Sequence, residues 1–135
     1  MSIRLTLPLP PSKNRLYTNA KRWTRGKDGR RKSYMGRQKS VRYLAFEQAA
    51  GWAVLQQTTP QEREALQRIV AERPLSLTAY VRFPKDGRDH DTANITDALL
   101  DAIKGPLGVD DERFWRVSVE RVESGPPCEV VIEAT

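Results

Sequence analysis

Four aspartates in two short polar segments are the residues of this chain best suited to metal chemistry. Asp89 and Asp91 form an Asp-X-Asp motif, and Asp110 and Asp111 stand side by side further along. Carboxylates held close together repel one another unless a divalent cation is bound between them. Mg²⁺ suits such a group, because it takes one or two carboxylates and completes its shell with water and phosphate oxygens. Two such ions can promote hydrolysis of a phosphodiester.

The alternative interpretation is that these aspartates only build turns. Asp is frequent at helix N-caps and in turns, where its side chain accepts hydrogen bonds from free backbone N–H groups. The metal interpretation requires the two motifs to meet in space. Because they flank a single predicted helix, we expect that helix to return both motifs to the same edge of a sheet.

A strongly basic segment accompanies the acids. Residues 13–42 hold twelve Lys/Arg and one acid, a net charge of +11, while the rest of the chain holds eleven Lys/Arg and sixteen Asp/Glu, a net charge of −5. Tyr17, Trp23 and Tyr34 are interleaved with the positive charges. Basic side chains neutralise phosphates and aromatic rings stack on unpaired bases, so we expect this arm to bind DNA; the alternative is a solvated loop. The predicted phosphate contacts are Lys13, Arg15, Lys21, Arg22, Arg25, Arg30, Arg31 and Lys32.

Periodicity predicts the elements that must position these residues. Alternating apolar residues predict strands over 3–7 and 75–83, and two more near Trp115–Val119 and Val130–Ile132, the last antiparallel to the one before it. Residues 12–39 predict a long loop, or a hairpin around Asp28-Gly29.

Three helices are expected between these strands. The first covers 40–57, and its predicted buried side is Val41, Leu44, Ala45, Ala49, Trp52 and Leu55. The second covers 59–72 behind a Thr59–Glu62 capping box, and the third runs from Asn94 or Thr92 to Lys104, ahead of Gly105-Pro106. The order indicates an α+β fold over a single domain, residues 1–135, with a mixed four-stranded sheet and helices on one face.

Composition favours a cytoplasmic, membrane-free protein. No stretch reaches the roughly 20 apolar residues that span a bilayer, and residues 1–10 lack a signal-peptide pattern. Cys128 is the only cysteine, which fits a reducing compartment and predicts a structural thiol.

Several segments together resemble the RusA family of Holliday junction resolvases. Leu7-Pro8-Leu9-Pro10-Pro11-Ser12-Lys13-Asn14-Arg15 resembles the family's opening strand and proline-rich turn. The run 88–94, followed by 97–103, resembles its Asp-X-Asp-Asn motif and the next helix, and 108–111 resembles its Asp-Asp turn. The match touches most of the chain, although residues 53–73 look longer than the family's minimum.

The resemblance implies a homodimeric, Mg²⁺-dependent endonuclease that cuts four-way DNA junctions and is often encoded by prophages. It implies that Mn²⁺ substitutes for Mg²⁺. Asp89, Asp91 and Asp111 take the catalytic metal-ligand roles, and Asp110 is a further candidate ligand.

Two positions depart from the family pattern. Thr92 and Ala93 separate Asp91 from Asn94, whereas in the family Asn follows the second Asp directly. Asp97 stands where the family has a lysine, so it is either a further ligand or a cause of reduced activity. Lys85 or Lys104 are candidates to supply the missing charge.

Other residues have two readings each. His90 is either an accessory acid–base or substrate-orienting group, or an exposed loop residue. The alternative for Asp97, Asp101 and Lys104 is a polar helix face with no further role. Phe114 and Trp115 are expected in the core or a dimer interface. Two other functions stay open: a branched-DNA-binding module that does not cut, and a nuclease for flaps or other DNA.

Overall fold

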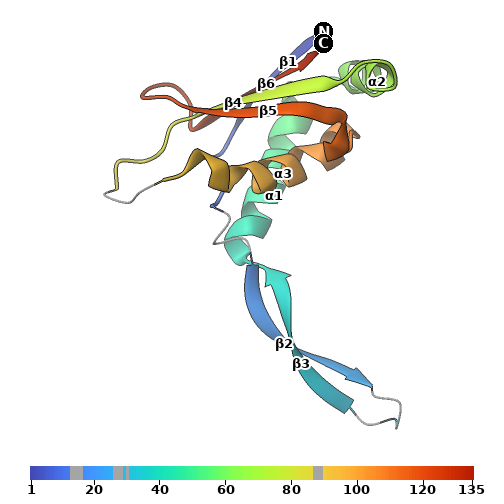
Figure 1. Ribbon diagram of the computed structural model, residues 1–135, viewed down its shortest axis with the longest axis vertical. Helices are drawn as coiled ribbons and strands as arrows, with labels where there is room; N and C mark the ends of the chain where they lie inside the picture. The colour runs from blue at the N-terminus through green and yellow to red at the C-terminus, as the bar shows by residue number, and fades with distance from the viewer. Residues whose placement is uncertain (13–16, 26–28, 30, 87–89) are drawn as a thin grey trace.

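The structure is a computed structural model that describes residues 1–12, 17–25, 29, 31–86 and 90–135, with the backbone path alone for 17–25 and 31–37. A four-stranded mixed sheet forms one layer and helices form the other (Figure 1). The fold is therefore α+β, as the order of the predicted elements indicates.

The sheet contains β1 (Ser2–Leu7), β4 (Leu75–Val81), β5 (Phe114–Arg121) and β6 (Cys128–Ala134), in the order β1-β6-β4-β5. β6 is antiparallel to both β1 and β4, and β4 is parallel to β5. The last two strands thus run in opposite directions, as predicted, but β4 lies between them. The parallel pair β4–β5 is joined by a crossover through a helix, which such a connection requires.

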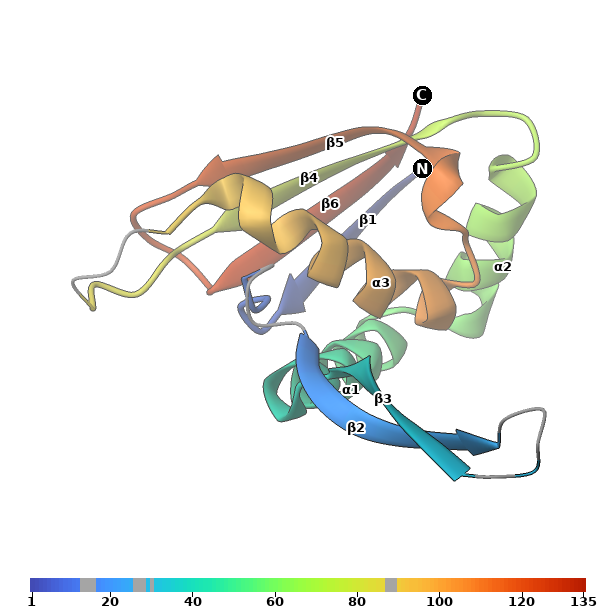
Figure 2. The same cartoon turned by 60° about the horizontal axis from the view of Figure 1, so that its bottom comes forward.

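Helices α1 (Val41–Gln57) and α3 (Thr96–Leu107) cover one face of the sheet, and α2 (Pro60–Ile69) lies at one end of it (Figure 2). The Thr59–Glu62 capping box is present in both directions. The expected end of α3 at Lys104 is wrong. Gly108 adopts a left-handed φ of 70° and closes the helix, while Pro106 is accommodated inside its last turn.

The predicted inner side of α1 is also wrong. The structure buries Tyr43, Phe46, Ala50 and Val54 and leaves the predicted stripe on the outside. Both sets recur at helical spacing, so periodicity alone does not choose between them. Packing favours the set that contains Tyr43, which is fully buried and whose hydroxyl donates to Asp101 of α3 at 2.6 Å.

Of the two structures predicted for the basic segment, the hairpin is confirmed for residues 17–25 and 31–39. β2 (Tyr17–Arg25) and β3 (Arg31–Lys39) pair antiparallel over their whole length and make a separate two-stranded sheet. Figures 1 and 2 show this hairpin projecting away from the main sheet beyond the start of α1. The basic segment is therefore a protruding arm.

The core lies between the sheet and the helices. Inward residues of β1, β4 and β6 pack against α1 and α3. Cys128 belongs to this core, and burial raises the pKa of its thiol to about 12, so it is a structural residue as predicted. Among the described residues, no helix combines the length and apolar character needed to cross a bilayer.

Candidate functional site

The two aspartate motifs lie at opposite ends of α3. Asp91 follows β4, whereas Asp110 and Asp111 precede β5. β4 and β5 are parallel neighbours, with Leu75 opposite Phe114. The C-terminal end of β4 and the N-terminal end of β5 therefore lie at opposite ends of this strand pair. The twelve residues of α3 alone separate the motifs by about 18 Å. The predicted convergence of Asp91 with Asp110 and Asp111 is therefore wrong within one chain.

Asp91 introduces the N-terminal end of this connection. Its Oδ1 accepts a hydrogen bond from the backbone N–H of Ala93 at 2.9 Å, and so caps the short 3-10 helix η2 (Thr92–Ile95) that leads into α3. The capping role belongs to Asp91, not to Thr92 or Asn94 as predicted. This bond engages one carboxylate oxygen, and the side chain is exposed. Asp91 is thus a turn residue that also presents a carboxylate to solvent.

His90, next in the chain, is held by two contacts. Its Nε2 lies 3.0 Å from Oδ1 of Asp86, and its ring stacks on Phe83 with 4.9 Å between centroids and 7° between planes. Its side chain is 21% exposed, so it is not the freely exposed loop residue that one reading expected. The chain therefore fixes this imidazole in one orientation.

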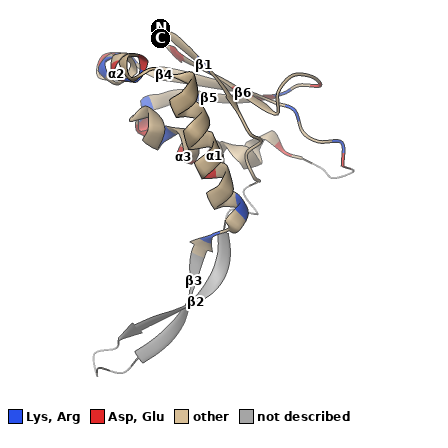
Figure 3. Cartoon of the chain, turned by 180° about the vertical axis from the view of Figure 1, so that it is seen from behind, with Lys and Arg blue, Asp and Glu red and all other residues tan. Residues whose placement is uncertain are grey.

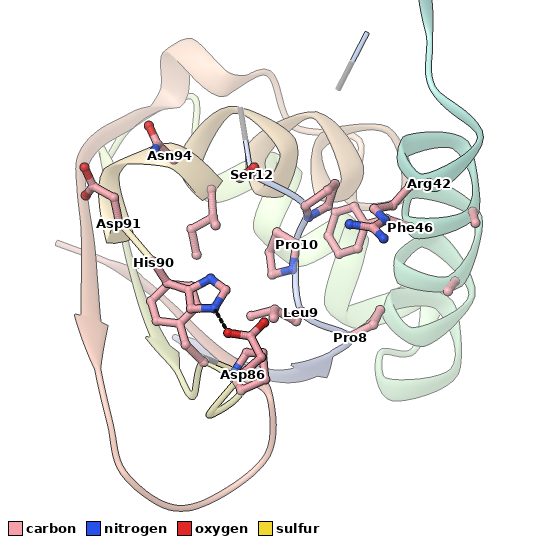
Figure 4. Close-up of a pocket in the computed structure, with 16 residues that line it drawn as sticks. Pro8, Leu9, Pro10, Ser12, Arg42, Phe46, Asp86, His90, Asp91 and Asn94 are labelled. Atoms are coloured by element: carbon pink, nitrogen blue, oxygen red, sulfur yellow. Dashed lines mark hydrogen bonds and ion pairs between the residues drawn. The ribbon is translucent and has the colours of Figure 1, made fainter. Parts of the chain in front are cut away.

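These residues line a cavity of about 850 Å³ between the proline-rich segment after β1, the first half of α1 and the segment around His90 (Figure 4). Its apolar walls come from Pro8, Leu9, Pro10, Pro11, Phe46, Phe83, Ala45, Ala49 and Ile95. Its polar groups come from Ser12, Arg42, Asp86, His90, Asp91 and Asn94. Cavities of this size and mixed lining are the usual binding sites of small molecules and of parts of larger ones.

The basic arm starts and ends at this cavity. Ser12 lines it just before the arm begins, and Arg42 lines it in the first turn of α1, where the arm ends. In Figure 3 the first turn of α1 carries positive charge at the base of the hairpin. An elongated ligand bound along the arm would therefore reach the cavity that Asp91 and His90 line.

The C-terminal end of α3 has a different character. Gly108 N donates to Lys104 O at 2.9 Å, and Gln67 of α2 donates to Leu107 O at 3.0 Å. Asp110 and Asp111 are exposed, and Asp110 makes no side-chain capping bond. This end is a helix cap tied to α2, with two carboxylates directed to solvent.

The remaining predicted residues have mostly structural places. Asp101 accepts from Tyr43 and pairs with Lys104 at 3.4 Å, which makes it a link between α1 and α3. Asp97 is exposed in the first turn of α3, where a negative charge favours the helix dipole. Lys85 is exposed in the segment after β4, next to Asp86.

The two aromatic residues at the start of β5 have different surroundings. Phe114 is in the core as expected, but Trp115 is 79% exposed, so of its two expected places the core is wrong and a dimer interface stays a prediction. Asp89, Lys13, Arg15 and Arg30 lie outside the described residues. The predicted contacts on the arm whose backbone is described are Lys21, Arg22, Arg25, Arg31 and Lys32.

The described residues near Asp91 do not form the three-carboxylate metal site that the sequence predicted. No group of three His, Cys, Asp or Glu residues within metal-binding reach occurs among the described residues. Asp86 and Asp91 line the same cavity, and one or two carboxylates are what Mg²⁺ ordinarily takes from a protein. In Figure 4 the two carboxylates lie apart, with His90 between them, so each is a single carboxylate that could hold Mg²⁺ together with water and phosphate oxygens.

Sequence reasoning missed Asp86, Arg42 and the proline-rich wall as parts of the site. No sequence pattern pointed to Asp86, because its contact with His90 lies in a segment outside the helices. Nothing in the sequence indicated that Arg42 and Pro8–Pro11 would face the same cavity, because that depends on how α1 packs against the end of β1.

Comparisons with known proteins do not show which family the chain belongs to. Neither a family model nor a curated protein matches it. Among solved structures, 2C-methyl-D-erythritol-2,4-cyclodiphosphate synthase is similar over 88% of this chain and 98% of that chain, at 17% identity and a TM-score of 0.30. A likeness of that size carries no argument about fold or function.

Proposed function

We propose that the chain is a Mg²⁺-dependent endonuclease that cuts branched DNA, with four-way junctions as its preferred substrate. One observation carries the proposal: a hairpin from a segment of net charge +11 starts and ends at the cavity that holds Asp91, Asp86 and His90. Phosphate binding and hydrolysis need these two features side by side.

The residues of the cavity and those of the arm have separate roles in this proposal. Asp91 would hold Mg²⁺, and the further candidate ligands are Asp86, which lines the same cavity, and Asp89, which lies outside the described residues. The ion would supply water activation and neutralise charge on the scissile phosphate. The arm would position the phosphodiester, and Arg42 at its base would pair with a flanking phosphate.

A DNA-binding module that does not cut is the second candidate. The separation of the acids across α3 favours it, because one chain brings at most part of the expected ligand set together. Asp97 in place of the family lysine favours it as well. Both candidates predict binding to branched DNA, and cleavage alone separates them.

We further propose a homodimer formed through the outer face of α1. Val41, Leu44, Trp52 and Leu55 are 85%, 51%, 61% and 46% exposed, and together they form one apolar stripe opposite the buried face. Gln48, which is also exposed, lies in the middle of this face, and large apolar side chains gathered on one exposed face are a mark of an interaction surface.

The positions in this stripe are symmetric about Gln48. Val41 and Leu55 are equally far from it along the helix, and so are Leu44 and Trp52. A two-fold interface requires that residue i meet residue j and that j meet i. An antiparallel pair of α1 helices with its axis at Gln48 satisfies this condition, and it would place two arms on one dimer.

A cytoplasmic location is part of the same proposal. A DNA substrate calls for access to the genome, and the single thiol, Cys128, is compatible with a reducing compartment. Its burial makes it no candidate for pairing between subunits.

The decisive assay uses a labelled four-way junction, a flap and a linear duplex, each with Mg²⁺, Mn²⁺ or EDTA. We expect paired nicks near the branch point with either metal, and binding without cleavage in EDTA. Equal cutting of the linear duplex would refute the preference for branched DNA, and cutting of the flap alone would favour the flap nuclease. Binding without cleavage in every metal would establish the non-cutting module.

A further inference from the structure

The apolar walls of the cavity are not explained by metal and phosphate binding. A phosphodiester and its counterions need charged and polar partners, yet most of the residues that line this cavity are proline, alanine, leucine, isoleucine and phenylalanine. Apolar walls with a few polar groups at fixed positions are typical of sites for a planar, largely uncharged ligand. The cavity therefore has a second occupant to account for.

His90 and Phe83 provide a rigid aromatic surface in this cavity. Phe83 is buried and Arg121 lies 5.5 Å above its ring centroid, so the ring that supports His90 is itself held in place. With Phe83 stacked against the imidazole and Asp86 bonded to its Nε2, the ring does not rotate freely. Flat, fixed rings of this kind stack on nucleobases without regard to sequence.

Charge selects the part of the nucleotide that can enter. Asp86 and Asp91 both line the cavity, so a phosphate that enters without a metal ion would meet two carboxylates, whereas a base carries no net charge and can enter with or without the ion. In Figure 4 Arg42 lies on the opposite side of the proline segment from His90 and Asp91. Its guanidinium is therefore placed for a flanking phosphate rather than for the base beside His90.

We propose that this cavity binds a nucleobase of the DNA substrate that has left the base stack at the branch point. The inference rests on the proposed function, because it treats the ligand as part of the nuclease substrate. Base entry would bring the adjoining phosphate to the rim at Asp91, one sugar away. Branched DNA meets this requirement at low cost, since bases at a branch point are more easily unstacked than bases inside a duplex.

The test combines a filled cavity with a missing base. Ala49 lines the cavity yet is exposed on α1, so Ala49→Phe fills the space without disturbing the core. Ala71→Phe is the matched control, because Ala71 is exposed beyond α2 and does not line the cavity. Junctions carry an abasic site at each nucleotide next to the branch in turn, and affinity is measured in EDTA by fluorescence anisotropy.

For the unchanged chain and for Ala71→Phe, we expect one abasic position to weaken binding about tenfold. For Ala49→Phe, the intact junction should bind about tenfold more weakly, and the same abasic site should then have no further effect. His90→Ala should behave like Ala49→Phe, whereas His90→Phe should keep the abasic effect because it preserves the flat surface.

Three outcomes separate this inference from the proposed function. If no abasic position matters although the junction is bound and cut, the base-binding inference is wrong and the nuclease stands. If abasic and cavity effects multiply independently, the base binds somewhere other than this cavity, and the inference is again wrong. If no junction is bound at all, the proposed function fails, and the inference fails with it.

Discussion

The two ends of α3 carry the same residue type with different surroundings. At the N-terminal end, Asp91 stands beside a cavity with a fixed imidazole and the base of a positively charged arm. At the C-terminal end, Asp110 and Asp111 stand beside a helix cap and a contact to α2. An aspartate motif thus indicates chemistry only when its neighbours supply a place for substrate.

The largest expected effect separates these two ends directly. Asp91→Asn should lower junction cleavage at least about 100-fold with Mg²⁺, because it removes a negative ligand, while junction affinity in EDTA is retained. Asp110→Asn and Asp111→Asn, alone or together, should change cleavage by no more than a few-fold, since about 18 Å of helix lies between them and the cavity. Single-turnover cleavage rates provide the comparison.

Equal loss in both sets would break the comparison in an informative way. The C-terminal acids could then act only in a site shared by two subunits, because one chain holds the motifs apart. Mixing an Asp91→Asn chain with an Asp111→Asn chain would restore cleavage in that case. No restoration is expected if each cavity works with its own acids.

The proposed dimer sharpens the same comparison, because it decides whether a partner can reach either end. Trp52→Glu places a charge in the outer stripe of α1 and should raise the dimer dissociation constant at least about 30-fold, as loss of a buried tryptophan anchor does. Trp115→Glu, at another exposed tryptophan, should leave the dimer intact. Sedimentation velocity over a range of concentrations distinguishes them; a monomeric unmodified chain would refute this interface.

Salt dependence tests which end the arm serves. Replacing Lys21, Arg22 and Arg25 with Gln removes three positive charges from β2. Junction affinity should fall about tenfold, and the slope of log affinity against log salt should become shallower by roughly 2 to 3. Replacing Arg63, Arg68 and Arg73 instead, around α2 near the other end, should leave the slope unchanged. A slope altered equally by both sets would mean that DNA contacts the whole molecule.

The sequence was sufficient for most elements and insufficient for their relative placement. Capping of α2 by Thr59 and the strand over Leu75–Val81 were predictable, because local hydrogen bonds and alternation determine them. The inner face of α1 was not, because two apolar faces compete and only contact with α3 through Tyr43 and Asp101 decides between them.

For the site, too, the sequence identified single residues but not how they are placed relative to one another. Asp91 and His90 were identified as candidate residues from type and spacing alone. Their separation from Asp110 and Asp111 depends on β4 and β5 being parallel neighbours, which periodicity does not reveal. Asp86 and Arg42 joined the site only because the chain segments that carry them pack around one cavity.

The smallest expected effect concerns the C-terminal end as a structural device. Gly108 has a φ of 70°, and a Cβ there would collide with the Gln67 side chain, so Gly108→Ala should destabilise folding by about 1–2 kcal/mol. Gly105→Ala is the matched control: a Cβ at Gly105 meets nothing within 4 Å, and Ala suits the helix interior, so stability should stay equal or rise by up to about 1 kcal/mol. Urea unfolding measures both. Because the cap is remote from the cavity, Gly108→Ala should cleave junctions at nearly the rate of the unchanged chain at a temperature where it remains folded. A large loss of cleavage in the folded protein would mean that the two ends of α3 are coupled, and that the cap does more than close a helix.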